Sequence, residues 1–368
     1  MRMARARLRA GDVMSKFDVI SRLRALHVHS ARIFCALLLG VGAQAAISGP
    51  ASAPGALVEP AVGSERDVAQ WIEHVRAAPC ARPYAGTFVV LAASGAMASS
   101  RIWHACDGTQ QLERVETLSG TPRIVFRRDN EVRTFLPLSK AVRIDQREAS
   151  GVFPRVPVVS GAVIANFYGA RIVGQDRVAG HVADVVWFKP KDSLRFGYRI
   201  WSERNTGLVV KLQTLGSDGR VLEQAAFSEL DLNSAVRADQ IARMMEATDG
   251  YKTSAPGAVP TTAKAEGWNL RQQIAGFVPV NCHKRRVSQD DPPQGDVLQC
   301  LYSDGLASVS LFLEAYDPQR HPAQTQVSGM GATQMLAQRV PADVWVTAVG
   351  EVPLQTLRLF VGQLERVR

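Results

Sequence analysis

Three residue types that can support covalent catalysis stand close together in the segment SSRIWHACDG, residues 99–108. His104, Cys106 and Asp107 would suit a thiolate nucleophile with a histidine base. On an extended strand, however, His104 and Cys106 share one face about 7 Å apart, which is long for a hydrogen bond between nucleophile and base. Two hypotheses fit the segment. One is a thiol-dependent enzyme; the other, which we favour, is a strand of a binding scaffold whose cysteine forms a disulfide.

No other grouping of residues indicates catalysis or metal binding. The five histidines beyond residue 45 are scattered, with neither a C-x-x-C nor an H-x-x-x-H spacing. The chain also lacks the G-x-S-x-G nucleophile elbow, the phosphate-binding G-x-x-x-x-G-K-[ST] loop and the dinucleotide-binding G-x-G-x-x-G pattern. We therefore predict no catalytic residue, no metal and no cofactor.

The basic charge of the chain is concentrated at its N-terminus. Of the formal net charge of +9, residues 1–45 carry +6, from eight Lys and Arg against two Asp, so only +3 remains elsewhere. Arginines precede the apolar run 33–41, which small residues follow, as in a cleavable signal peptide. This run is too short to span a bilayer, which needs about 20 residues. We predict an exported protein with a signal peptide at 1–45, a spacer at 46–63 and no nucleic-acid partner.

Four cysteines lie beyond the signal peptide, and an even number in an exported protein favours disulfides. Three connectivities are compatible with the sequence. We favour Cys80 with Cys106 and Cys282 with Cys300, because each bond then lies within one domain and closes a loop of 26 or 18 residues. A disulfide at Cys106 would leave no thiolate there, whereas a free thiol at Cys106 would support the enzyme hypothesis.

A run of short β-rich segments with turn residues between them follows an amphipathic helix at 64–78. Consecutive strands joined by short turns predict an antiparallel sheet rather than βαβ units. Eleven strands in one twisted sheet must curl, which produces a concave face for the helix to cover. The predicted strands are 84–93, 101–106, 111–118, 123–128, 131–137, 141–146, 171–178, 181–188, 196–203, 208–215 and 220–230.

A compositional change after this sheet predicts a second domain. Residues 64–232 form the first domain, and residues 233–264, rich in Ala, Thr, Gly and Pro, are predicted to be an interdomain linker with a short helix at 238–247. Residues 265–368 are predicted to form a small α+β domain. It contains a hairpin that turns at 303–305, and a terminal helix whose first position is Pro353 and whose apolar positions repeat with helical spacing.

Aromatic side chains recur across the predicted sheet, and most of them are expected in the core. Some could instead line a concave pocket for acyl chains, because each buried methylene contributes about 0.8 kcal/mol without any polar group. The candidates for this lipid-binding surface, chosen by strand position, are Phe88, Ile102, Phe126, Phe135, Trp187 and Tyr198.

From about Trp71 to its C-terminus the chain resembles the MucB/RseB family of periplasmic sigma-E regulators. The stretches that carry the resemblance occur in order and are YAGTFV, SSRIWHACDG, ERVETLSGTPRIVFRRDNEVRTFLP, RVAGHVADVVWFKPKDSLRFGYRIWSERNTGLVVKLQTL, VLEQAAFSEL, YSDGLASVSLFLE and VGEVP. One departure is VVLAASGAMASS, residues 89–100, which is apolar where relatives tend to be polar.

The resemblance implies a fold, a location and a function. The expected fold is mainly β, with an unclosed antiparallel β-barrel covered by helices, similar to the LolA and LppX carriers, followed by a smaller α+β domain. The expected function is in the periplasm: binding the periplasmic segment of a membrane anti-sigma factor of the RseA/MucA type and shielding it from proteolysis. Binding of lipopolysaccharide or lipoprotein acyl chains would release the anti-sigma segment. The alternative is a periplasmic carrier of lipoproteins or acyl chains, and self-association into a homo-oligomer stays open.

Two turns of the second domain are the candidates for the partner-binding surface. The alternative is that they are ordinary turns without a binding role, since SDG is a hairpin tip by its chemistry alone and Pro353 starts a helix. The candidate residues are Tyr302, Ser303, Asp304, Gly305, Gly350, Glu351, Val352 and Pro353.

Overall fold

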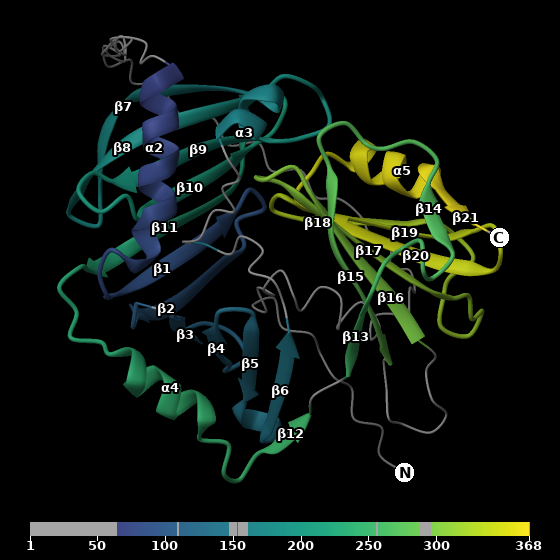
Figure 1. The fold of residues 1–368 in the computed structure, drawn as a ribbon, viewed down its shortest axis with the longest axis horizontal. Coiled ribbons are helices and arrows are strands. Elements are labelled where there is room, and N and C mark those ends of the chain that lie inside the picture. The colour runs from purple at the N-terminus through teal and green to yellow at the C-terminus, as the bar shows by residue number, and fades with distance from the viewer. Residues whose placement is uncertain are drawn as a thin grey trace, which may run out of the picture. The chain divides into compact units, whose positions relative to one another are not determined.

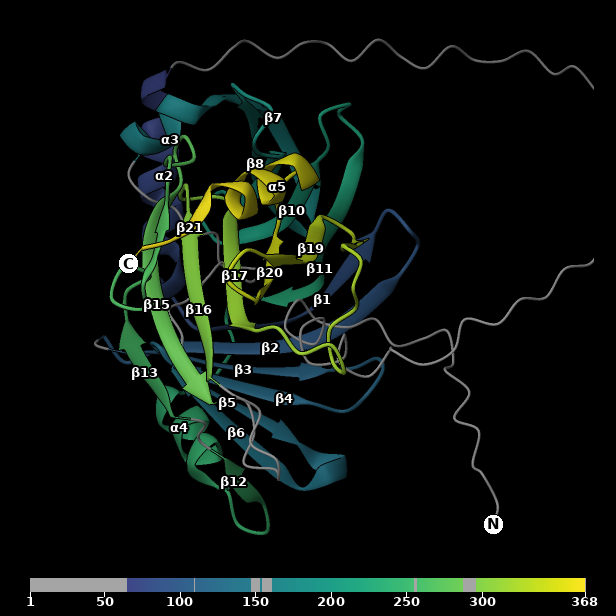
Figure 2. The same cartoon turned by 90° about the vertical axis from the view of Figure 1, so that its right-hand side faces the viewer.

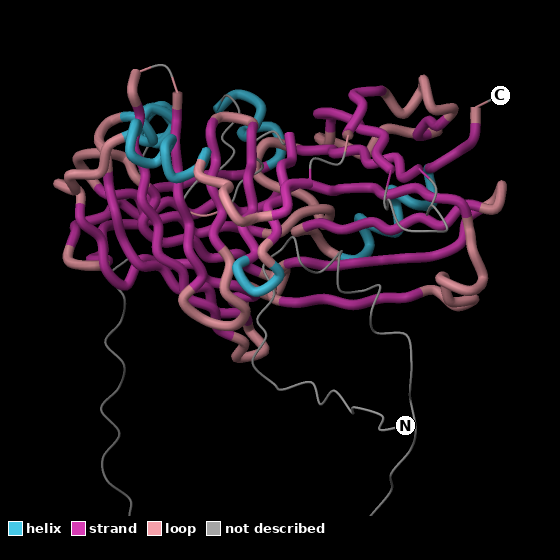
Figure 3. Tube along the Cα trace, turned by 90° about the horizontal axis from the view of Figure 1, so that it is seen from below, coloured by secondary structure: helices cyan, strands magenta, loops and turns pink. Residues whose placement is uncertain are grey.

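The computed structural model describes residues 65–108, 110–146, 153, 161–254, 257–286 and 296–367. The predicted signal peptide and spacer lie outside these residues. None of the helices in the described ranges is long and apolar enough to cross a membrane. Strands make up most of this part of the chain, as Figure 3 shows, and the helices are short.

The first sheet has twelve strands in the order β12-β6-β5-β4-β3-β2-β1-β11-β10-β9-β8-β7 (Figure 1). Its neighbours are antiparallel except for the parallel pair β12–β6. The predicted antiparallel sheet and its eleven strands are confirmed, with small differences at the strand ends. The strands are β1 Tyr84–Ala92, β2 Met97–Cys106, β3 Gln111–Thr117, β4 Ile124–Arg128, β5 Glu131–Leu136, β6 Ala141–Gln146, β7 Tyr168–Val178, β8 His181–Pro190, β9 Gly197–Glu203, β10 Val209–Leu215, β11 Val221–Asp231 and β12 Lys252–Ser254.

Two meanders, β1–β6 and β7–β11, join side by side in this sheet through the pair β1–β11. Phe88 lies opposite Phe227 in that pair, and a bulge follows Thr87. Gly86 is required there, because a Cβ atom at this position would lie 2.5 Å from the carbonyl oxygen of Glu229. The close approach of the two strands therefore depends on a residue without a side chain.

Helices pack on both faces of the first sheet. Helices α2 (Glu65–Ala77) and α3 (Gly161–Phe167) pack on one face, here called the α2 face. The ring of Trp71 lies 5.8 Å from that of Phe188, and its indole N–H donates to the Ser202 hydroxyl at 2.6 Å. Because paired residues on neighbouring strands share a face, the register places most of the largest buried cluster on the α2 face.

Helix α4 (Ala238–Glu246) packs on the opposite face, here called the α4 face. Its Ile241 and Met245 are four residues apart and are both buried against side chains of β3–β6. Glu246 at its end forms ion pairs with Arg128 and Arg133 of the sheet. The helix predicted at 238–247 is thus confirmed.

The stretch predicted as an interdomain linker is largely structured. Besides α4 it contains β12, which extends the first sheet, and β13 (Ala258–Thr261), which extends the second sheet. Its composition suggested a linker because two short edge strands contribute few apolar residues, and because the apolar spacing in α4 is only one turn long.

The second sheet has seven strands in the order β13-β15-β16-β17-β20-β19-β18, and β15, β16 and β17 run side by side in Figure 2. Helix α5 (Leu354–Gln363) follows Pro353 and buries Leu357, Phe360 and Val361 in the core of this domain, as its spacing predicts. Two further strands, β14 Trp268–Leu270 and β21 Leu364–Arg366, pair with each other in a separate small sheet. The other strands of the second sheet are β15 Val278–Arg286, β16 Asp296–Ser303, β17 Ser308–Ala315, β18 Gln326–Met330, β19 Thr333–Val340 and β20 Val344–Gly350.

Candidate binding surfaces

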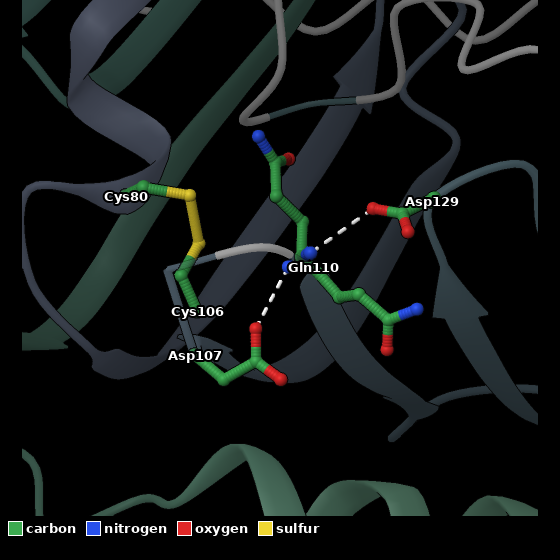
Figure 4. Close-up of a disulfide and its surroundings, with 6 residues drawn as sticks. Cys80, Cys106, Asp107, Gln110 and Asp129 are labelled. Carbon is green, nitrogen blue, oxygen red and sulfur yellow. Dashed lines mark hydrogen bonds between the residues drawn. A yellow bond between two sulfur atoms is a disulfide. The ribbon is translucent and has the colours of Figure 1, made fainter.

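Cys106 forms a disulfide with Cys80 (Figure 4), so it carries no thiolate in this structure. The bond ties the segment after α2 to the end of β2. Asp107 stabilises the next turn by accepting the Gln110 N–H at 2.8 Å. Asp129 accepts the Gln111 N–H at 3.1 Å in the same way. The cysteine and the aspartate of the SSRIWHACDG segment thus have structural roles at one end of the sheet.

His104 is fully buried and packs within the first sheet. Its ring stacks on Tyr84 with a centroid separation of 4.7 Å and an interplanar angle of 13°. It lies opposite Glu113 on β3, which is also fully buried and forms an ion pair with Arg127 on β4 at 3.2 Å. The side chain of His104 is therefore part of a buried row across neighbouring strands.

The second disulfide joins Cys282 and Cys300, which lie directly opposite each other on β15 and β16. Both predicted pairings are confirmed. Among the described residues, no group of three His, Cys, Asp or Glu side chains is placed to hold a metal ion.

The six candidates for lipid binding do not share one surface. Phe88, Ile102 and Tyr198 lie on the α2 face and belong to its core. Phe126 and Phe135 lie on the α4 face, under α4. Trp187 also lies on the α4 face, where it is half-buried beside Arg171 and Arg199 of the neighbouring strands. Alternation along each strand separates them, and the sequence alone did not give the register that decides which residues face the same way.

The two turns chosen as partner candidates are brought together by the second sheet. Tyr302 lies opposite Val309 on β17, and Val309 lies opposite Gly350 on β20. Buried within this group are Tyr302, Asp304, Gly305, Gly350 and Val352, whereas Ser303, Glu351 and Pro353 are half-buried. The half-buried side chains are those that another molecule could contact.

Two residues of the first domain bind Asp304, one in the loop between β8 and β9 and one at the start of β7. The Arg195 guanidinium donates to its Oδ2 atom at 2.7 Å, and the Tyr168 hydroxyl donates to the same atom at 3.1 Å. The other carboxylate oxygen accepts the N–H groups of Leu306 and Ala307 at 2.9 and 2.7 Å. Asp304 therefore shapes its own turn and also binds the loop that precedes β9.

Aromatic rings surround Arg195, and each of its three guanidinium nitrogens donates a hydrogen bond. Its guanidinium carbon lies 4.6 Å from the Phe167 ring centre and 5.2 Å from that of Phe277. It also donates to the carbonyl oxygen of Ala275 at 2.6 Å and to Asp192 at 3.0 Å. This arrangement offsets part of the large cost of burying a charge. Neither Arg195 nor Tyr168 stands out in the local sequence.

Burial raises the pKa of the Tyr168 hydroxyl well above its ordinary value, and the pKa of Tyr198 is raised for the same main reason. Both side chains are thus neutral around pH 7, and the Tyr168 hydroxyl can donate a hydrogen bond to the Asp304 carboxylate.

Together these features define a mainly β protein with two large sheets, each stabilised by a disulfide, and with a buried ion pair between them. Residues 67–245 match the family model for the MucB/RseB N-terminal domain, and residues 262–365 match that for the MucB/RseB C-terminal domain. The chain belongs to the MucB/RseB family.

Two relatives illustrate the similarity. The sigma factor AlgU regulatory protein MucB of Pseudomonas aeruginosa is 30% identical over 302 residues, which cover 79% of this chain and 88% of the relative. The sigma-E factor regulatory protein RseB of Escherichia coli K12 is 24% identical over 262 residues, covering 71% and 79% respectively.

Two solved structures are also similar to this chain. The crystal structure of MucB in complex with MucA(peri) has a TM-score of 0.63 and 26% identity, covering 81% of this chain and 98% of that one. The complex structure of Pseudomonas aeruginosa MucA/MucB has the same TM-score with 27% identity, covering 82% and 99%.

Proposed function

We propose that this protein is a periplasmic negative regulator of the sigma-E envelope stress response. It binds the periplasmic segment of a membrane-anchored anti-sigma factor of the RseA/MucA type and protects that segment from proteolysis. The observation that carries the proposal is the match of both family domains, together with the similarity to MucB solved in complex with MucA(peri). The function is binding without catalysis, which agrees with a cysteine that is in a disulfide and a histidine that is buried.

The partner surface in this proposal includes the half-buried side chains of the paired turns. Ser303 directly precedes the buried Asp304, and Glu351 follows Gly350, which lies opposite Val309 on the strand after the Asp304 turn. The ion pair of Asp304 with Arg195 thus supports the turn that presents Ser303. A buried, hydrogen-bonded charge pair is a rigid support, because moving either charge leaves the other unpaired.

Lipid sensing would act on the α2 face. Phe153 comes from the segment between β6 and β7, and its ring lies 5.4 Å from that of Phe88 and 5.2 Å from that of Phe227. An acyl chain could occupy this position if the Phe153 ring moved away. A lipid that binds better to the free protein than to the complex must weaken the complex by the same factor.

The test is calorimetric titration of the purified, oxidised protein with the periplasmic segment of its anti-sigma factor. The variant S303R/E351R should bind at least about tenfold more weakly, because two large, positively charged side chains enter the surface. The variant Q319R/E365R adds the same charge elsewhere in the second domain and should bind normally. If the segment is not bound at all, or if both variants bind like the wild type, the proposed function or its surface is wrong.

Three further measurements test the proposal against its alternatives. The bound segment should be cut more slowly by its site-1 protease, whereas a pure acyl-chain carrier would give no protection. A count of free thiols in the oxidised protein should be zero, and a free thiol at Cys106 would reopen the enzyme hypothesis.

The variant F153A should take up more of a fluorescent acyl-chain probe than the wild type if the α2 face is the lipid site.

A further inference from the structure

A row of directly paired residues crosses seven strands of the first sheet on its α4 face, beyond the part that α4 covers. Each member lies opposite the next in the register, so their side chains project on the same side. The row, from β7 to β2, is Arg171, Trp187, Arg199, Gln213, Gln224, Leu91 and Met97.

One end of the row is cationic and aromatic. Arg171 lies over the Trp187 ring at 4.7 Å from its centre, and Arg199 lies 6.0 Å from it. Lys211 lies 4.3 Å from the ring centre of Trp201, whose indole N–H donates to Asp176 at 3.0 Å.

These cations lack the carboxylate partners that many exposed cations of this chain have. Within the described ranges, no Asp or Glu lies at ion-pair distance from Arg171, Arg199, Lys211 or the exposed Lys189, which follows Trp187 on the same face. Their charge is therefore available to an anionic partner.

The other end of the row is apolar and exposed. Leu91 and Met97, which face each other across the β1–β2 hairpin, are 42% and 59% exposed. The neighbouring hairpin end adds Val221 at 39%, and the Ala93 N–H donates to Leu222 O at 2.8 Å between the two hairpins. Leu91 and Met97 belong to the segment 89–100, whose apolar character departs from the pattern expected of the family.

We propose that this row is a docking surface for an anionic phospholipid bilayer. The β1–β2 hairpin places Leu91 and Met97 among the acyl chains, while Arg199, Lys211 and Arg171 contact lipid phosphates around it. The half-buried indole of Trp187 suits the interfacial region between them. A bilayer interface combines negative charge and hydrocarbon within the roughly 20 Å that separate Met97 from Arg199 across four strand spacings. An acidic peptide would use only the cations, and an apolar partner only the hairpin.

The experiment is flotation of the purified, oxidised protein with vesicles of phosphatidylglycerol and phosphatidylcholine, and with phosphatidylcholine vesicles alone. The variant R171Q/R199Q/K211Q should bind the anionic vesicles about 100-fold more weakly, since each basic residue near such a surface contributes about fivefold. The variant L91S/M97S should also weaken binding. The matched control R76Q/K284Q/R339Q removes the same net charge from exposed, ion-paired positions and should bind within about twofold of the wild type.

Several results would overturn the proposal. They are the absence of binding to anionic vesicles, equal binding to neutral vesicles, and an equal loss in the control variant. A protein that binds polyglutamate through these three cations but ignores vesicles would have an acidic protein partner here instead of a bilayer. Anti-sigma binding is measured separately, without lipid, so failure of this proposal leaves the proposed function standing.

Discussion

The Arg195 guanidinium and the Asp304 carboxylate are 2.7 Å apart, and neither side chain has any exposure to solvent. Arg195 belongs to the loop between β8 and β9, and Leu194 beside it packs into the core of the second sheet. In return, Leu306 from the turn after Asp304 packs against the core of the first sheet. The ion pair thus lies between two reciprocal apolar contacts, which water does not reach.

Removing one charge of this pair should be costly. We expect R195L to lower the free energy of unfolding by about 3–5 kcal/mol, because Asp304 would stay buried without a cation. The double variant R195L/D304L should recover much of that loss, since it leaves no unpaired charge. Urea denaturation followed by circular dichroism measures both. A single variant that unfolds like the wild type would show that the pair is solvated in solution.

The position of the Arg195 side chain also depends on Gly276, which has a φ of +84°. A Cβ atom there would lie 2.9 Å from both the Arg195 Nη1 atom and the Phe167 ring. We expect G276A to destabilise the protein by more than G250A. Gly250 has a φ of +77° but open space around it, so it should show only the conformational cost of about 1 kcal/mol. Equal effects in thermal unfolding would mean that the contact yields easily.

Alkaline pH should destabilise the contact through Tyr168. Its folded pKa is raised above the ordinary value of 10.0, chiefly by burial. The stabilising effect of a neutral Tyr168 is therefore fully present below pH 10 and is lost as pH rises above it, because the unfolded chain ionises first. The variant Y168F should lose about 1 kcal/mol at pH 7, from the missing hydrogen bond to Asp304, but should show a weaker dependence on pH above 10. A parallel pH dependence in urea denaturation would count against this assignment.

Glu246 at the end of α4 gives a prediction at acid pH. Hydrogen bonds from Arg128, and then from Arg133, lower the pKa of its carboxylate below the ordinary value of 4.5. Its stabilising effect is present above pH 4.5 and is lost as pH falls through the lowered pKa. Hydrogen exchange should therefore show faster opening of α4 in E246Q at pH 7. The wild type should approach the rate of the variant only at acid pH. The variant E229Q, on a different part of the sheet, is the control.

Each disulfide should stabilise its own domain. The two disulfides close loops of 26 and 18 residues, which the variants C80A/C106A and C282A/C300A leave open. Each variant should lose about 3 kcal/mol of its free energy of unfolding in the chain-entropy model. Differential scanning calorimetry of the two variants, with and without reductant for the wild type, provides the measurement. Insensitivity of the wild type to complete reduction would contradict this prediction.

The local pattern of the sequence determined the eleven strands and the helices at both ends, and the division into domains favoured the observed pairing of the cysteines among three possible ones. Alternation in EVRTFLP already indicated that Val132 and Thr134 face away from Arg133 and Phe135, as the register confirms. Such features depend on neighbours within a few residues, where the period of a strand or helix is written directly in the order of polar and apolar side chains.

The tertiary structure decided which distant segments meet. The pairing of Phe88 with Phe227, the packing of α4 within a stretch that looks like a linker, and the bond from Arg195 to Asp304 join residues more than 100 positions apart. Local sequence carries little information about these contacts, because many strands have similar alternation and any two could pair. Only the simultaneous burial of both sheets' apolar faces, with the buried charges of Arg195 and Asp304 paired, selects one arrangement.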